Sequence, residues 1–144
     1  MMASKTILVV DDEVGIRSLL FDVLSNQGFQ VSLAKDGIES LDQMKARRFD
    51  LLITDVSMPG IGGLELLKRM KEAGRRERVI VMTGEPIEQS DLGAELQPVF
   101  RLLQKPFPIR NFLDVVYSAF AKSSGGGGKS GVPGRRRAEG CSIN

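Results

Sequence analysis

The chain has 144 residues, of which 42% are hydrophobic and 26% are charged, as in an ordinary globular domain that buries a sizeable core. Histidine is absent and there is one cysteine, Cys141, which excludes an internal disulfide, the usual zinc sites and catalytic Ser-His or Cys-His pairs. The formal net charge is +2, but residues 123–144 contribute +3, which leaves residues 1–122 at −1 and without the basic surplus typical of nucleic-acid binding.

Short apolar runs and amphipathic segments alternate along residues 6–120. Apolar or alternating runs predict five strands, at 6–10, 29–34, 51–55, 78–82 and 99–103. Apolar residues at helical spacing predict five helices, over 16–24, 38–44, 64–70, from Pro86 onward, and over 109–120. Gly28 and Gly74 are expected to end the first and third helices. The fourth helix has the weakest pattern, because Gly93 interrupts it and its apolar residues are sparse.

This alternation predicts one α/β domain over residues 1–122. Right-handed crossovers favour a flavodoxin-like three-layer fold, in which a five-stranded parallel sheet of order 2-1-3-4-5 carries five helices on its two faces. Residues 123–144 differ, because seven of these 22 residues are glycine and few are apolar, so we expect a Gly/Arg-rich disordered tail. Gly125–Ser130 is similar to the end of a phosphate-binding P-loop, but a predicted helix precedes it where that motif needs a strand.

The sequence carries no sign of a membrane segment. No apolar run approaches the roughly 20 residues of a membrane span, and the N-terminus lacks the apolar core of a signal peptide. We therefore expect a cytoplasmic protein with no membrane partner. The charge of residues 1–122 argues against a nucleic-acid partner, although Arg135–Arg137 leave open a tail that binds nucleic acid.

Polar side chains follow four of the predicted strands. Asp11 and Asp12 follow the first strand, Asp55 ends the third, Thr83 follows the fourth and Lys105 the fifth. Because the carboxyl ends of parallel strands share one edge of a sheet, we expect these side chains to meet there. Three crowded carboxylates need a cation or a proton between them, and an all-oxygen ligand set suits Mg²⁺. With an ammonium and a hydroxyl beside it, such a site is typical of phosphoryl chemistry.

Four motifs extend this pattern across residues 5–122: Val9–Glu13, Ile53–Gly60, Val81–Gly84 and Gln104–Phe107. Together they resemble the receiver domain of bacterial two-component response regulators, in the stand-alone form of chemotaxis regulators. The resemblance implies a protein that takes a phosphoryl group from a sensor histidine kinase or a histidine phosphotransfer protein. It would then signal through a phosphorylation-dependent contact with a downstream protein or through a phosphorelay, and it would not be a dedicated enzyme.

The resemblance also implies the role of each site residue. Asp55 would be the phosphoacceptor, Lys105 would hold one phosphoryl oxygen and Thr83 would move in to bond another. The implied Mg²⁺ ligands are Asp12 directly, Asp11 through water, Asp55, and the backbone carbonyl of Ser57. We expect the side chains of Ser57 and Glu85, which flank the site, to tune the hydrolysis of the phosphorylated form.

One position departs from the family pattern, and two alternatives remain. Leu102 stands where the family usually has an aromatic residue that rotates on activation, with Phe100 two residues before it. A phosphatase of the haloacid dehalogenase type also uses an aspartyl nucleophile and Mg²⁺, but it needs a second acid where this chain has Ser57. A receiver-like binding module that is never phosphorylated is the other alternative, against which the complete set of acids and Lys105 argues.

Overall fold

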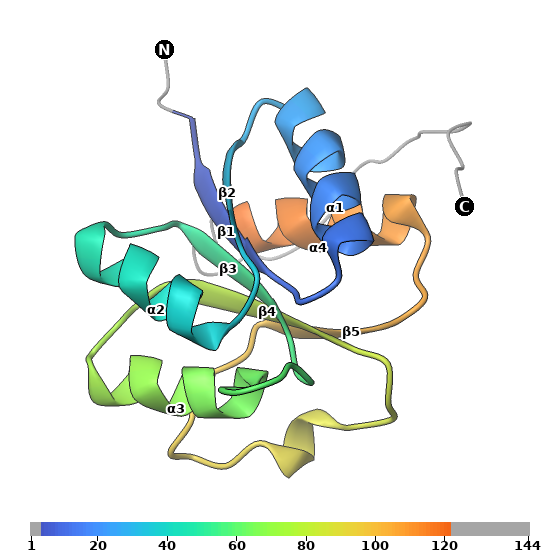
Figure 1. The fold of residues 1–144 in the computed structure, drawn as a ribbon. Helices are drawn as coiled ribbons and strands as arrows, with labels where there is room; N and C mark the ends of the chain where they lie inside the picture. Colours follow the sequence, from blue (N-terminus) through green and yellow to red (C-terminus); the bar gives the residue numbers. More distant parts are fainter. Residues whose placement is uncertain (1–3, 122–144) are drawn as a thin grey trace. The chain divides into compact units, whose positions relative to one another are not determined.

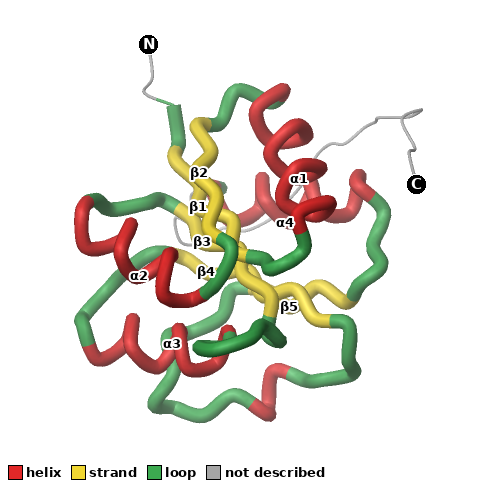
Figure 2. Tube along the Cα trace, viewed as in Figure 1, coloured by secondary structure: helices red, strands yellow, loops and turns green. Residues whose placement is uncertain are grey.

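The computed structural model describes residues 4–121, and in this range five parallel strands form one sheet (Figures 1 and 2). The strands are β1 (Thr6–Val10), β2 (Gln30–Ala34), β3 (Leu51–Asp55), β4 (Arg78–Thr83) and β5 (Arg101–Gln104). Their order is β2-β1-β3-β4-β5, which confirms the predicted topology. The predicted tail, residues 123–144, lies outside the described residues, and the expectation of disorder stays a prediction.

The chain forms two compact units, one ending at Lys105 and the other beginning at Pro106. The first unit contains the whole sheet and three helices, α1 (Val14–Asn26), α2 (Gly37–Ala46) and α3 (Gly63–Glu72). Helix α1 covers one face of the sheet, and α2 and α3 cover the other, so the expected three layers are present (Figure 1). The second unit contains α4 (Ile109–Phe120), and Phe107, which precedes this helix, stacks on Phe112 with ring centroids 5.6 Å apart.

The central strands are buried on both sides, as their continuous apolar sequences predict. On the side of α2 and α3, strand residues pack with helix residues in one cluster that includes Leu8, Val10, Leu52, Val79, Val81, Met44, Leu66, Leu67 and Met70. The alternate strand residues point to the other face, where α1 contributes Leu20 and Leu24, both of them buried. No helix within residues 4–121 is long and apolar enough to cross a membrane.

The helix predicted to start at Pro86 does not form, so the described residues contain four α-helices rather than five. Between β4 and β5 the chain makes only a 3₁₀ turn, η1 (Gln89–Asp91). The backbone N–H of Asp91 donates to the carbonyl of Glu88 at 2.8 Å, and the Asp91 carboxylate accepts from the backbone N–H of Glu88 at 2.9 Å. This reciprocal pair satisfies the backbone locally and competes with a helix, which Gly93 and sparse apolar residues cannot support.

Arg75 joins the ends of α2 and α3 at the amino-terminal side of the sheet. Gly74 follows the end of α3 and adopts the left-handed conformation, with a φ of 73°, so the chain leaves the helix just before Arg75. The Arg75 guanidinium donates to the carbonyls of Met44 at 2.6 Å and Arg47 at 3.1 Å, and it pairs with Glu77. The Glu77 carboxylate also accepts from the backbone N–H of Phe49 at 3.1 Å.

These contacts set the protonation of Glu77, whose side chain is only 2% exposed. Burial alone would raise the pKa of Glu77, but the hydrogen bonds from Arg75 and from the backbone of Phe49 outweigh it and lower that pKa below the ordinary value. Because the pKa is lower in the folded chain than in the unfolded chain, the Glu77 carboxylate stabilises the fold above the unfolded pKa. That contribution is lost as the pH falls through the folded pKa.

Replacing Glu77 by Gln should therefore destabilise the fold in a pH-dependent way. At pH 7 we expect the free energy of unfolding to fall by about 3 kcal/mol, because Arg75 loses its buried partner. The deficit relative to the wild type should shrink as the pH falls through the lowered pKa of Glu77, where Glu77 itself becomes neutral. Urea unfolding at pH 7 and over a series of acidic pH values measures this, with Glu72→Gln, at an exposed position of α3, as the control. A deficit that does not depend on pH would contradict the assigned role.

Candidate functional site

The first and third strands bring three carboxylates together at the carboxyl edge of the sheet. Strands β1 and β3 are neighbours, and Val10 pairs with Thr54, so the residues that follow this pair are brought side by side. One carboxylate oxygen from each of Asp11, Asp12 and Asp55 lies within 4.8 Å of the others. Asp11 is fully buried and Asp55 is 7% exposed, whereas Asp12 is exposed to solvent. The three acids therefore lie together at one edge of the sheet, as the sequence predicts.

Lys105 reaches this cluster from the end of β5. Its Nζ lies 3.1 Å from Oδ2 of Asp11 and 2.9 Å from Oδ2 of Asp55, so one ammonium bridges both acids. The backbone N–H of Lys105 donates to the carbonyl of Thr83 at 2.7 Å, which fixes the start of this side chain beside the end of β4. The bridge is largely shielded from water, since the Lys105 side chain is 19% exposed, and screening by salt is correspondingly weak.

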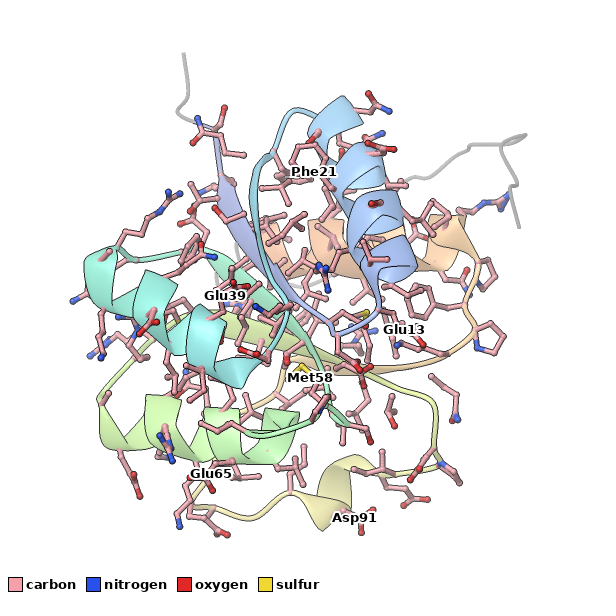
Figure 3. The ribbon with its side chains drawn as sticks, viewed as in Figure 1. Glu13, Phe21, Glu39, Met58, Glu65 and Asp91 are labelled. Carbon is pink, nitrogen blue, oxygen red and sulfur yellow. The ribbon has the colours of Figure 1, made fainter. Side chains whose placement is uncertain are left out.

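The two buried acids are held in the same way. Oδ1 of Asp11 accepts from the backbone N–H of Glu13 at 2.9 Å, and Oδ1 of Asp55 accepts from the backbone N–H of Ser57 at 3.0 Å. In each acid the other oxygen, Oδ2, faces Lys105. The loops that follow β1 and β3 therefore aim both carboxylates at one point, and Figure 3 shows Glu13 and Met58 in these loops.

Burial and hydrogen-bonded charges have opposite effects on the pKa values of Asp11 and Lys105. Burial raises the pKa of Asp11, and the hydrogen bonds from the Glu13 backbone and from Lys105 reverse only part of this rise. Burial would lower the pKa of Lys105, but its hydrogen bonds to Asp55 and Asp11 raise that pKa above the ordinary value. Lys105 therefore stays charged at neutral pH, as an anion-binding role requires.

The donor set fits a hard divalent cation. The cluster places three carboxyl groups against the single positive charge of Lys105, so a further cation between the acids would be favourable. All of the ligand atoms offered are oxygens, and one acid faces solvent, which suits an ion such as Mg²⁺ that keeps several water ligands. Ser57 borders the cluster through the backbone N–H bonded to Asp55, and the role of its carbonyl stays a prediction.

Thr83 lies at the same edge but does not bond to the acids in this structure. Its hydroxyl donates to the carbonyl of Glu85 and accepts from the backbone N–H of Glu85, both at 3.0 Å. The side chain therefore closes its own turn at the end of β4.

Leu102 packs against the core cluster on the side of α2 and α3, and Phe100 lies under the guanidinium groups of Arg78 and Arg101.

Two further residues shape the site, and the sequence motifs did not single them out. Arg17, one turn into α1, donates from Nη1 to the carbonyl of Asp11 at 2.8 Å and so holds the loop after β1. Gly63 begins α3 against the end of β3, where an added Cβ would lie 2.3 Å from the carbonyl oxygen of Asp55. The Gly62-Gly63 pair in the sequence was the available signal for this close approach.

Comparisons with known proteins point to one family. A family model described as the response regulator receiver domain matches residues 7–117. Sporulation initiation phosphotransferase F of Bacillus subtilis is 39% identical over 120 residues, which cover 80% of this chain and 93% of that protein. Response regulator MprA of Mycobacterium tuberculosis is 36% identical over 115 residues, which cover 76% of this chain and 48% of MprA. The chain thus spans about half the length of MprA.

Solved structures give the same picture. Chemotaxis protein CheY4 of Vibrio cholerae superimposes with a TM-score of 0.75 at 28% identity, covering 82% of this chain and all of that one. Response regulator protein TrrA of Thermotoga maritima, solved in complex with Mg²⁺ and BeF, superimposes with a TM-score of 0.72 at 32% identity, covering 81% of this chain and 99% of that one.

Gly63→Ala should destabilise the fold, because its Cβ would overlap the backbone at the end of β3. We expect a loss of about 2 kcal/mol in the free energy of unfolding, the size typical of an overpacked site. Gly15→Ala is the matched control: no atom lies within 4 Å of its added Cβ, and alanine should stabilise α1 by about 0.8 kcal/mol. Urea unfolding of both variants tests this. An unchanged free energy of unfolding in Gly63→Ala would contradict the expected overlap with the backbone of β3.

Mg²⁺ binding should respond in opposite directions to two changes in the cluster. Asp12→Asn removes one of three carboxylates and should weaken Mg²⁺ binding about tenfold, or ~1.4 kcal/mol. Lys105→Met removes the ammonium that competes for Asp11 and Asp55, and should tighten Mg²⁺ binding. Isothermal titration calorimetry measures both changes, with Glu13→Gln as the control for an exposed neighbouring acid. Equal affinities in all four proteins would place the ion elsewhere.

Proposed function

Because the chain belongs to the response regulator receiver domain family, we propose that it is a phosphoacceptor, modified on Asp55 in a Mg²⁺-dependent reaction. The observation that carries the proposal is the position of Lys105, 2.9 Å from Asp55 within a cluster of three carboxylates. We propose that the chain assists its own phosphorylation and dephosphorylation and is not a dedicated enzyme.

The reaction follows from the chemistry of these groups. A carboxylate oxygen of Asp55 attacks phosphorus in line, and the bond from phosphorus to the imidazole nitrogen of a phosphohistidine breaks, with its electron pair leaving on the imidazole. Lys105 then exchanges part of its bonding from the carboxylates to a phosphoryl oxygen, because its ammonium already lies beside Asp55. Bound Mg²⁺, held by Asp11, Asp12, Asp55 and the Ser57 carbonyl, would neutralise charge on the phosphoryl oxygens.

Thr83 and the loop after β4 are the proposed sensor. The Thr83 hydroxyl is bonded to the backbone of Glu85, and a phosphoryl group on Asp55 offers it stronger, charged acceptors. Moving Thr83 toward the phosphoryl group frees the turn at Gly84 and Glu85, which shifts the population of the β4–β5 connection. Leu102 packs against the core cluster at the position of the usual aromatic switch, so this connection is the proposed route of the signal.

Receiver domains of this family interact with histidine kinases or histidine phosphotransfer proteins. We propose a kinase or phosphotransfer protein as the donor, and a downstream protein or a further phosphotransfer protein as the recipient. The Bacillus subtilis relative is named a phosphotransferase, which supports the relay form. A phosphatase of the haloacid dehalogenase type is disfavoured, because Ser57 stands where that chemistry needs an acid.

Incubation with acetyl phosphate and Mg²⁺ should add one phosphoryl group to the wild-type chain, detected by intact mass. Asp55→Asn should remain unmodified, since the amide cannot act as the nucleophile, and chelation of Mg²⁺ should abolish the reaction. Asp50→Asn is the matched control, because Asp50 precedes the same strand but bonds to Thr6 and is remote from the cluster. A wild-type chain that stays unmodified would favour a binding module without phosphorylation, and an adduct on Asp55→Asn would assign another acceptor.

A further inference from the structure

Positive charge is concentrated where α2 and α3 end. Residues 45–48 and 68–78 contain nine cations and two acids, a net charge of +7, whereas residues 4–121 as a whole contain 15 cations and 17 acids. We call these two segments the basic end. Arg75 ties them together through its bonds to the carbonyls of Met44 and Arg47. Apart from Arg75, the cations of the basic end are exposed, so this charge faces solvent.

A groove of about 450 Å³ runs between α2 and α3 beside the basic end. Its apolar lining residues are Ile38, Leu41, Met44, Met70 and Ala73. Met44 and Met70 are deeply buried, whereas Ile38 is 51% exposed at the mouth of the groove. Methionine side chains are flexible and polarisable, and they adapt to apolar side chains of different shapes.

The charged residues around this groove are mostly cationic. Lys45, Arg69 and Arg75 line it together with one acid, Asp42. Lys45 and Asp42 are 4.0 Å apart and both largely exposed, so water weakens their pairing. Arg69 bonds to Glu65 through Nε, which leaves its two terminal nitrogens to face another acceptor. An apolar lining with a cationic rim is complementary to a ligand with apolar side chains flanked by carboxylates.

We propose that this groove binds an acidic amphipathic helix of a protein partner, and that the basic end beside it attracts that helix over a longer range. Apolar side chains of that helix, at positions i, i+3 or i+4, and i+7, would occupy the groove, and its Glu or Asp residues would meet the cations of the rim. A nucleic acid fits less well, because Phe49 is buried and the ring of Phe100 is already in contact with the guanidinium groups of Arg78 and Arg101. A lipid surface fits less well, because Met44 and Met70, the innermost apolar side chains of the groove, are recessed between two helices.

Binding at this groove does not depend on phosphorylation. Neither its lining nor the basic end contains a residue of the acidic cluster or Lys105, and the basic end lies at the amino ends of β3 and β4, opposite the carboxyl edge. The unphosphorylated chain and Asp55→Asn should therefore bind the helix equally. This separates failure of the present inference from failure of the proposed phosphoacceptor function.

A synthetic helical peptide with leucines along one face and glutamates elsewhere, labelled with fluorescein, tests the proposal against the full chain by fluorescence anisotropy. We expect saturable binding that Ile38→Glu and Arg69→Glu each weaken about tenfold, ~1.4 kcal/mol. Lys68→Glu, on the same helix but outside the groove, should weaken binding by about threefold or less, because only screened long-range attraction is lost. The methyl NMR signals of Met44 and Met70 should shift on binding.

Several outcomes would overturn the proposal. Absence of binding, or an equal effect of Lys68→Glu and Arg69→Glu, would exclude the groove as the site. Equally strong binding of a peptide with the same composition in scrambled order would show that charge alone acts. Tighter binding to duplex DNA or to anionic lipid vesicles than to the peptide would assign the basic end to another class of ligand, and self-association in sedimentation would assign it to a second copy.

Discussion

The bridge from Lys105 to Asp11 and Asp55 is the contact on which the carboxyl edge of the sheet depends. Two acids this deeply buried and this close would repel each other and resist ionisation without a cation between them. The bridge also explains the geometry around it, because each acid uses one oxygen for a backbone N–H and the other for the ammonium. The same contact makes the site ready for a phosphoryl group: the charges that receive it are in place before it arrives, and they need only exchange partners.

The sheet makes this arrangement possible because its strands are fixed from both sides. Apolar residues on alternate positions of β1, β3 and β4 pack with α2 and α3 on one face, and α1 packs against β1 and β2 on the other, so a shift of register by one residue would expose a full apolar face. The side chains that leave the carboxyl ends of these strands are held by the core behind them. The loops then need only short local bonds, such as those from Glu13 and Ser57, to aim the acids.

Strand order and the meeting of Asp11, Asp12, Asp55 and Lys105 could be predicted from the sequence, because both follow from apolar runs that end in polar residues in a parallel sheet. The prediction of a helix from Pro86 onward was wrong. The reciprocal hydrogen bonds between Glu88 and Asp91 form a local turn there, which the periodicity of apolar residues does not reveal. The direction of the Thr83 hydroxyl and the contact of Arg17 with the Asp11 carbonyl were also beyond prediction. They depend on rotamers and loop geometry, which a pattern of residue types does not encode.

The opposite placement of acids at the carboxyl edge and cations at the amino ends of β3 and β4 gives the sheet-bearing unit a permanent electric dipole along its strands. A dipole turns an approaching molecule before contact, so a partner with a positive surface meets the acidic pole first, and one with a negative surface meets the basic pole first. The proposed phosphoryl donor at the carboxyl edge and the proposed acidic helix at the basic end would therefore use separate surfaces of this unit. Salt screens this steering, so a rise in ionic strength should lower the association rate constant more than the affinity.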